Sequence, residues 1–237
     1  MRRVRKFQLI AWAALIAGAT IFAALWLGLV PPRLNPLAPL VLSEPSTWFL
    51  DLKLSALKSD PAVCATVLKP PIVVSEPVGD QPLKAGCGWS NAVRVNSAAG
   101  VRVAAGTLTC EMAAALAMWL EYEVQPAAMR SFGQRVVSLH HMGSYACRNV
   151  IGAKLWTSHR SQHARANALD VASFTLADGR VVSVFKHWKT EGSPDSFFLH
   201  EVHSRACRYF RAALSPNFNG AHANHFHLDR GRFPACR

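Results

Sequence analysis

The chain has 237 residues and a formal net charge of +12 at pH 7, from 26 Lys and Arg against 14 Asp and Glu. A basic balance of this size favours polyanionic partners, but no nucleic-acid-binding motif accompanies it, so we expect no nucleic-acid partner. The sequence contains no internal repeat and no low-complexity segment.

The N-terminus combines basic residues with a long apolar segment. The basic residues are Arg2, Arg3, Arg5 and Lys6, and residues 9–30 contain no charged side chain. A run of this length crosses a hydrocarbon core of about 30 Å as a helix, and the basic flank places the N-terminus in the cytoplasm. We therefore predict a single-pass membrane anchor over residues 1–30. The alternative is a cleaved signal peptide, because Ala17-Gly18-Ala19 resembles a cleavage site and Arg2-Arg3 weakly matches a twin-arginine signal.

Prolines follow the anchor, at Pro31, Pro32, Pro36, Pro39 and Pro45. Because proline fixes φ and lacks an amide donor, residues 31–46 are predicted to form an extended, Pro-rich linker that lifts the next domain off the bilayer. Residues 47–237 then supply about 190 residues, enough for one domain with its own core.

All six cysteines lie beyond the apolar segment. An even number of cysteines in an exported domain predicts a disulfide framework, and the lack of any CxxC spacing argues against a cysteine zinc site. Sequence alone does not choose among the pairings. Joining the cysteines in chain order gives the working assignment Cys64–Cys87, Cys110–Cys147 and Cys207–Cys236.

The first half of the domain contains mainly helical patterns. Leucines from Leu50 to Leu57 predict a short helix, and residues 92–108 alternate loosely and predict a strand pair. An alanine-rich segment from Cys110 to about residue 123 carries apolar side chains at helical spacing, which indicates a helix packed on the core. Pro126 is expected to end or kink this helix.

The second half contains strand patterns around one helix. Residues 167–175 and 180–188 flank Asp178-Gly179, a strong hairpin signal. Apolar residues repeat every four positions over residues 197–214 and predict a helix, and a final strand is expected over residues 225–229.

Histidine is confined to the second half of the chain, since all ten lie at or beyond His140. Because histidine is the commonest protein ligand of zinc, this confinement suggests a local chemical use. Six of the ten are expected simply to lie on the surface: His140, His141, His159, His187, His200 and His203.

Two separated segments place imidazole and carboxylate groups at strand spacing. In the last strand, alternation puts His225, His227 and Asp229 on one face and turns the two residues between them into the core. In the earlier strand Asp170 shares its face with small alanines, and His163, which precedes it on a flexible stretch, can fold back toward the same point.

These groups match the needs of a catalytic zinc ion, which typically has three protein ligands and one open position for water. We assign His163, Asp170 and His227 as the ligands of one zinc ion per chain. Because the metal lowers the pKa of water and polarises a carbonyl, a proton acceptor or oxyanion stabiliser is also needed, and His225 is the candidate. The residues assigned to orient the ligands are Ser161, His222 and Asp229.

Ser161 and His163, with an aspartate, also suggest a serine hydrolase. No G-x-S-x-G surrounds Ser161, and a serine two residues from its base on one strand is poorly placed to transfer a proton to it, so this alternative is disfavoured. Ser161 can instead brace the loop by hydrogen bonding.

The pattern S-x-H-x6-D at residues 161–170, followed by H-x-H at residues 225–227, resembles that of the zinc D-Ala-D-Ala carboxypeptidases and murein endopeptidases. A closer resemblance is to the bacterial extensin-like C-terminal domain family, over most of residues 47–237. It rests on six segments in order: Gly143-Ser144-Tyr145-Ala146-Cys147-Arg148, Ser161-Gln162-His163-Ala164, Asn167-Ala168-Leu169-Asp170, Ala206-Cys207, Pro216-Asn217-Phe218-Asn219, and His222 through Asp229.

The resemblance implies an α+β fold in which one disulfide-stapled domain holds the metal on a small antiparallel sheet. It carries the ligand roles onto His163, Asp170 and His227, and it suggests Arg148 as a cation near the substrate or oxyanion. A surface arginine beside a disulfide is the alternative for Arg148. Several relatives place a glutamate three residues before the last ligand as general base, and Asn224 occupies that position here, where an amide cannot accept the proton.

The functional hypothesis is a zinc peptidase, anchored in a bacterial inner membrane with its domain in the periplasm, that hydrolyses an amide bond in peptidoglycan stem peptides. Residues 31–237 keep a net charge of +8, because residues 1–30 hold four positive and no negative charges. We therefore expect peptidoglycan or another anionic wall polymer as partner. The alternative, which Asn224 favours, is a non-catalytic wall-binding or envelope module that retains the metal fold.

Overall fold

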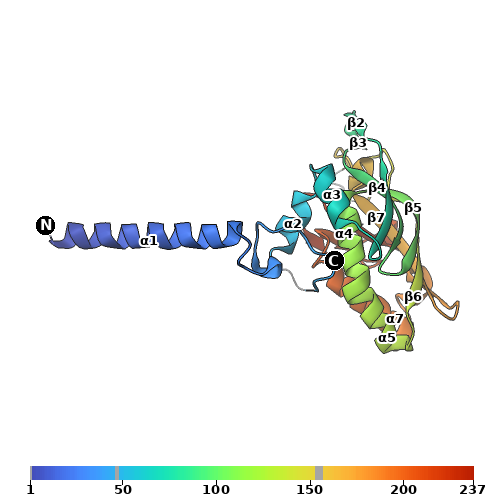
Figure 1. The fold of residues 1–237 in the computed structure, drawn as a ribbon. Helices are drawn as coiled ribbons and strands as arrows, with labels where there is room; N and C mark the ends of the chain where they lie inside the picture. The colour runs from blue at the N-terminus through green and yellow to red at the C-terminus, as the bar shows by residue number, and fades with distance from the viewer. Residues whose placement is uncertain (1, 46–47, 153–156) are drawn as a thin grey trace.

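The computed structural model describes residues 2–45, 48–152 and 157–237 (Figure 1). Helix α1 (Arg2–Trp26) extends away from the remainder of the chain, and its apolar part, Lys6–Trp26, has 21 residues. At about 1.5 Å per residue, a helix of that length matches a hydrocarbon core of about 30 Å. Among the described residues, it is the one helix long and apolar enough to cross a membrane. The predicted boundary between linker and domain, at residues 46 and 47, lies outside the described residues.

A nine-stranded mixed sheet forms the centre of the domain. Its order is β1-β4-β5-β6-β7-β10-β9-β11, with β8 paired to the second half of β7. The β5–β6 and β9–β11 pairs are parallel and the others antiparallel. The strands are β1 (Val73–Val78), β4 (Ala92–Ala98), β5 (Val101–Thr109), β6 (Val136–His141), β7 (Ala168–Leu176), β8 (Val181–Ser183), β9 (Ala212–Leu214), β10 (Phe226–Asp229) and β11 (Ala235–Cys236). A separate hairpin comprises β2 (Gln81–Lys84) and β3 (Cys87–Trp89).

The prediction of a small antiparallel sheet was therefore wrong in size and in strand direction. Sequence patterns revealed the long β4–β5 pair and β7, but β9 and β11 have only three and two residues. So few residues show no alternation of their own, and these strands exist because neighbouring strands supply their hydrogen-bond partners.

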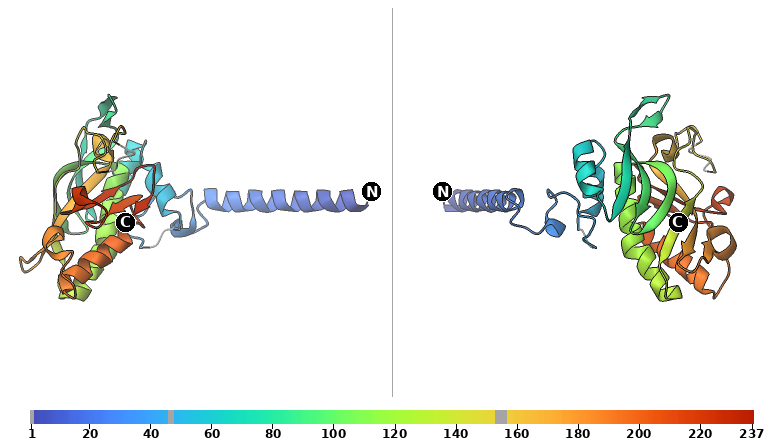
Figure 2. Two further views of the ribbon diagram at one scale, coloured as in Figure 1. Left: turned by 180° about the vertical axis from the view of Figure 1, so that it is seen from behind. Right: turned by 45° about the vertical axis from the view of Figure 1, so that its right-hand side comes forward.

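The helices pack against the sheet and around its edges (Figure 2). They are α2 (Leu50–Ala56), α3 (Pro61–Val67), α4 (Cys110–Trp119), α5 (Gln125–Phe132), α6 (Val184–His187) and α7 (Pro194–Ala206), with short turns η1 (Pro32–Leu34), η2 (Leu120–Val124), η4 (Gln162–Arg165) and η5 (Gly220–His222). All ten residues of α4 are buried, which explains its small alanine side chains. Its Trp119 contacts Phe174 of β7 and donates through Nε1 to the carbonyl of Val202 at 2.9 Å.

Pro126 does not end the central helix. The π-helical turn η2 precedes it, and there the amide of Gln125 donates to the carbonyl of Leu120, five residues back. The wider turn lets the chain continue into α5 despite the proline, so helical structure runs from Cys110 to Phe132.

Two predicted elements change type partway along. The helix expected over residues 197–214 ends with α7 at Ala206, and residues 212–214 instead form β9 beside β10. The strand expected over residues 180–188 ends at Ser183, whose hydroxyl accepts from the amide of Lys186 and begins α6. In both cases the spacing of apolar residues continues past the change. Strand pairing with β10 makes residues 212–214 extended, and the Ser183 cap starts the helix α6.

Two of the three assigned disulfides were wrong. The bonds are Cys64–Cys110, Cys87–Cys147 and Cys207–Cys236, so only the last was assigned correctly. The β4–β5 hairpin brings Cys110 back beside α3, where both sulfurs of that bond are buried. Cys87 lies in the outlying β2–β3 hairpin and joins the loop that leads to the candidate site. Sequence order fails because the fold brings together cysteines that are not neighbours along the chain.

The Pro-rich segment is packed against the domain rather than freely extended. Leu40 and Leu42 are buried, and the Tyr122 hydroxyl donates to the carbonyl of Leu42 at 2.7 Å. Asn35 Nδ2 donates to the carbonyl of Leu25 at 2.7 Å. These contacts join α1 to the domain through a short, structured connection.

Candidate metal centre

Strands β7 and β10 supply the core of the candidate site. They pair antiparallel with Asp170 opposite His227. As alternation requires, Phe226 and Leu228 are fully buried in the core, and His227 lies on the opposite face of β10 with Asp229.

His163 reaches the same face from the short turn η4. The Ser161 hydroxyl caps this turn by accepting from the amide of His163 at 3.3 Å. Ala166 then adopts a left-handed conformation, with φ of 52°, and turns the chain into β7. Ser161 thus stabilises the turn that carries His163 by hydrogen bonding, which is the structural role expected for it as the alternative to a nucleophile.

Three donor atoms converge in this place. The distance from His163 Nε2 to Asp170 Oδ1 is 3.1 Å, and from His227 Nδ1 to the same oxygen it is 3.0 Å. The two imidazole nitrogens are 3.2 Å apart. His163 and Asp170 are buried, the His227 side chain is 12% exposed, and the three ligand atoms lie within 4.8 Å of one another. Two imidazoles and one carboxylate form a donor set that suits zinc.

Asp229 determines which nitrogen of His227 faces this cluster. One carboxylate oxygen accepts from the amide of Gly231 at 2.7 Å, and the other is 2.9 Å from His227 Nε2. Because a carboxylate accepts hydrogen bonds, Nε2 carries the proton, and in neutral His227 the lone pair on Nδ1 points at Asp170.

The lone pair on His227 Nδ1 and the Asp170 carboxylate oxygen are both electron-rich and repel each other. A cation is needed to bridge them, either a proton or a metal ion. Without metal, burial opposes protonation of His227, but hydrogen bonds to Asp170 and Asp229 outweigh it and raise its pKa to about 9. Burial alone would raise the pKa of Asp170, yet hydrogen bonds from His163 and His227 hold it well below its usual range. These residues therefore fit a divalent cation by their chemistry.

His225 lies beside the cluster as a neutral base. Its Nδ1 donates to Asn224 Oδ1 at 2.8 Å, which leaves the lone pair on Nε2, and Nε2 is 3.5 Å from Asp170 Oδ1. Burial lowers the pKa of His225, so the imidazole is uncharged at neutral pH. Asn224 has a role that the sequence did not suggest: it orients the neighbouring imidazole.

His222 and Arg148 border the cluster. His222 Nδ1 bonds to Asn219 Oδ1 at 2.7 Å, and its ring centre is 5.3 Å from that of His225. Burial, followed by the charges of His227 and His225, lowers the pKa of His222 to about 4. Arg148 is half-buried next to the Cys87–Cys147 bond, and its charge contributes to the lowered pKa of both His222 and His225.

Among the six histidines assigned to the surface, His203 was placed wrongly. It is buried and packs against Phe226 of β10 and Trp188, with ring centres 5.0 and 5.6 Å away. Burial lowers its pKa to about 4. The other five are exposed or half-buried.

A shallow groove of about 370 Å³ begins beside the cluster at Asn224. A register shift where β6 pairs with β7 lets consecutive residues Ala172 and Ser173 both line its floor, on the same face as Asp170. Its remaining lining residues are His140, Met142, Val181, Ser183, Phe185 and Lys186, so no acidic side chain is included.

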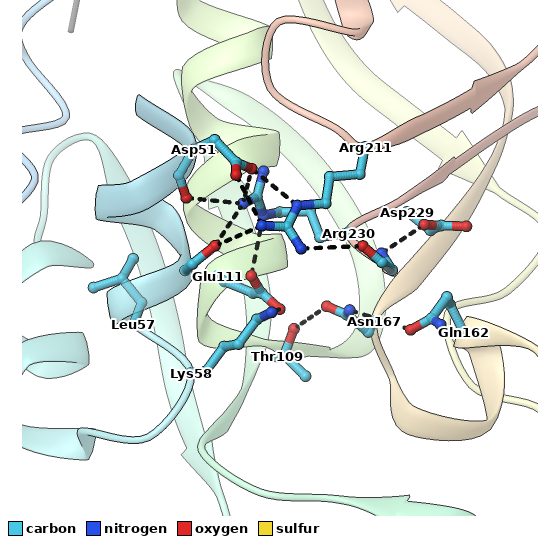
Figure 3. Close-up of polar contacts among 12 residues, drawn as sticks. Asp51, Leu57, Lys58, Thr109, Glu111, Gln162, Asn167, Arg211, Asp229 and Arg230 are labelled. Atoms are coloured by element: carbon cyan, nitrogen blue, oxygen red, sulfur yellow. Dashed lines mark hydrogen bonds and ion pairs between the residues drawn. The ribbon is translucent and has the colours of Figure 1, made fainter. Parts of the chain in front are cut away.

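A second polar cluster lies behind β10 (Figure 3). The fully buried Arg230 donates to Glu111 at 3.1 Å, to Asp51 at 2.8 Å and to the carbonyl of Tyr209 at 2.6 Å. Its amide donates to the carbonyl of Asn167, immediately before β7. This cluster fixes the end of β10 directly after Asp229. No sequence pattern indicated it, because its members are far apart along the chain.

The comparisons with known proteins give one result. Residues 62–237 match the sequence model of the family described as "Extensin-like protein C-terminus". No curated protein and no solved structure matches the chain. The match covers the whole candidate site and most of the chain, and the protein therefore belongs to the extensin-like protein C-terminus family.

Proposed function

We propose that the protein is a membrane-anchored, periplasmic zinc peptidase that hydrolyses an amide bond in peptidoglycan stem peptides. The observation that supports this most directly is the convergence of His163, Asp170 and His227, with the free lone pair of His225 3.5 Å from Asp170. Three ligands and an adjacent neutral base are the elements that metal-assisted hydrolysis requires.

The zinc ion would be held by His163 Nε2, His227 Nδ1 and the carboxylate of Asp170. When bound, zinc lowers the pKa of water and polarises a substrate carbonyl. Asp229 keeps the proton of His227 on Nε2, which leaves Nδ1 available as a ligand.

His225 would accept the proton of the attacking water. Burial keeps this imidazole neutral, and the hydrogen bond from Nδ1 to Asn224 aims Nε2 at the cluster. The Asn224 amide thus supports a histidine base where relatives use a glutamate. Arg148 would supply positive charge for the oxyanion or for a substrate carboxylate.

The groove supports a peptide as substrate. Its floor of Ala172 and Ser173 leaves space above the sheet, and exposed Met142, Val181 and Phe185 offer apolar contacts to an extended chain. With Lys186 in the groove and Arg148 near the cluster, carboxylate-bearing peptides are favoured.

The compartment is argued from α1 and the disulfides. A basic N-terminal flank predicts a cytoplasmic N-terminus, and disulfides persist in oxidising compartments such as the periplasm. The net charge of the exported residues favours the anionic wall as partner.

The test uses the full chain, purified in detergent with its disulfides intact. Elemental analysis should find near one zinc per chain, and incubation with purified sacculi should release muropeptides. We expect a His163→Ala, His227→Ala double variant to lose both zinc and release, and His225→Ala to keep zinc and lose release. His159→Ala, an exposed histidine away from the cluster, is the control and should keep both. A wild-type protein that binds no zinc, or a His225→Ala variant with unchanged release, would contradict the proposal.

The second candidate is a wall-binding module without catalysis. It is favoured by Asn224, since the usual carboxylate base is missing. In the same experiment it predicts bound zinc and binding to sacculi, with no muropeptide released by the wild type.

A further inference from the structure

Helix α2 and the two residues before it carry apolar side chains on two sides. Leu50 and Leu54 are buried in the core, as expected for a surface helix. On its outward side, however, Trp48, Phe49 and Leu52 are exposed, Trp48 to 79% and Leu52 to 56%. Outward positions of a surface helix usually carry polar residues, so an apolar outward face indicates a further contact.

The two charged residues of α2 are both bound by other parts of the chain, although the Asp51 side chain is 59% exposed. Lys53 is buried, and its Nζ donates to the carbonyl of Pro32 at 2.6 Å. The carboxylate of Asp51 is bound by Arg211 and Arg230.

The same apolar area continues into the segment that follows α1. The amide of Trp48 donates to the carbonyl of Arg33 at 3.3 Å, which places the start of α2 beside turn η1. Leu34 and Leu37 of this segment are exposed. Figures 1 and 2 show α2 and the connecting segment on the side of the domain from which α1 departs.

We propose that this basal surface, defined by Leu34, Leu37, Trp48, Phe49 and Leu52, rests in the headgroup region of the membrane that α1 spans. The occupant is argued from continuity, because the chain leaves α1 at Trp26, only a few residues before the surface begins at Leu34. Tryptophan is enriched at membrane interfaces, and Arg33 adds a cation for anionic headgroups. The proposal rests on α1 as a membrane span and is independent of the peptidase proposal.

The consequence is a fixed orientation. A domain held in the membrane by α1 alone could tilt or rotate together with that helix, whereas a second contact through α2 would keep the candidate metal centre at a constant height and direction above the lipid. Asp51 joins α2 to Arg230, which directly follows β10, so the contact is coupled to the strand that carries His227.

The test places the full chain in vesicles of phosphatidylethanolamine and phosphatidylglycerol. A Trp12→Phe, Trp26→Phe background removes the tryptophans of α1. Lipids brominated near the headgroup end of the acyl chain should then quench part of the remaining tryptophan emission. Adding Trp48→Phe should abolish that quenchable part, whereas adding Trp89→Phe, in the outlying β3 hairpin, should leave it intact. The wild-type protein, with Trp12 and Trp26 present, reports that α1 is inserted.

Equal quenching with and without Trp48, while α1 is inserted, would overturn the proposal. Protection of Trp48 from a water-soluble quencher without quenching by brominated lipid would also overturn it, because another protein or a second copy would then cover the surface. A Phe49→Ser, Leu52→Ser variant keeps Trp48 as reporter and should reduce its quenching by the brominated lipid, whereas Phe197→Ser on α7 should not.

Discussion

Two polar clusters lie at β10, and they differ in how their charges are balanced. Behind the strand, the guanidinium of Arg230 donates to Glu111, Asp51 and a backbone carbonyl, so donors meet acceptors. In front of it, His163 and His227 direct nitrogen atoms at one oxygen of Asp170, and His225 adds another lone pair at 3.5 Å.

The difference separates a structural cluster from a candidate binding site. The Arg230 cluster is complete in itself and binds the strand to the rest of the domain. The histidine cluster brings acceptor atoms together and becomes complete only with a cation, which is a proton in the metal-free protein and, in our proposal, zinc. Each cluster contains buried charged or polar groups, Arg230 and Glu111 in one and His163 and Asp170 in the other, so burial alone would not have told them apart.

The largest effect is expected when the Arg230 cluster is broken. Arg230→Met removes the buried cation beside Glu111 and leaves this carboxylate only the half-exposed Lys58, at 3.5 Å, so the free energy of unfolding should fall by about 3–5 kcal/mol. Urea unfolding of the full chain in detergent measures this. Arg211→Met is the control, since Arg211 also binds Asp51 but is 27% exposed, and its loss should cost below about 1 kcal/mol. Equal losses would show that burial of the pair does not determine the cost.

Zinc should stabilise the fold through the histidine cluster, whereas the Arg230 cluster needs no added ion. Addition of zinc at about one hundred times its dissociation constant should raise the unfolding free energy by about 2.7 kcal/mol. Asp170→Asn, which keeps the side-chain shape, should show no such increase. Asp178→Asn, at an exposed turn, serves as control and should show all of it. A zinc response retained by Asp170→Asn would remove Asp170 from the ligand set.

His203 of α7 is a buried imidazole that packs against Phe226 on the core face of β10, and among the described residues it forms no ion pair with a carboxylate. Burial lowers its folded pKa to about 4, while the unfolded value is about 6.5, so the unfolded chain takes up the proton first as pH falls. Stability contributed by neutral His203 is therefore complete above pH 6.5 and decreases, by on the order of 2 kcal/mol, as pH falls toward 4. His203→Phe should flatten this part of the stability–pH curve, measured by urea unfolding. An unchanged slope would assign the titration to other groups.

The smallest effect is expected from Asp229, which acts through His227. Asp229→Asn should weaken zinc binding by about 10–100-fold without abolishing it, because the proton on His227 Nε2 loses its charged acceptor. Competition with a chromophoric chelator gives the affinity. Unaltered affinity would mean that Gly231 and the strand backbone, rather than the carboxylate, set the orientation of His227.

The convergence of His163, Asp170 and His227 was more predictable than the fold around them. Alternation along β10 and the spacing from His163 to Asp170 are local properties, and the structure does bring the three side chains together, while their role as metal ligands stays a prediction. Asn224 and the Arg230 cluster were missed for a physical reason. Asn224 next to His225 forms no recognisable sequence pattern. Arg230 bonds to a glutamate 119 positions away, so nothing near Arg230 in the sequence indicates that it is buried.

The sheet and the disulfides were less predictable because they depend on contacts distant in sequence. Cys110 is next to Cys64 only after the β4–β5 hairpin has formed, and β9 is a strand only because β10 and β11 flank it. Patterns of apolar residues predicted well which side chains are buried. They predicted less well whether the backbone there is a helix or a strand.

The disulfide connectivity has a consequence for how the protein matures. The Cys64–Cys110 and Cys87–Cys147 bonds interleave, so each native partner becomes available only after an incorrect one. As the chain emerges N-terminus first, Cys64 meets Cys87 before Cys110 exists to compete. Oxidation that outpaces folding therefore traps the 64–87 bond, and recovery needs thiol–disulfide exchange. Native pairing therefore requires either that the β4–β5 hairpin forms before Cys64 is oxidised or that thiol–disulfide exchange follows.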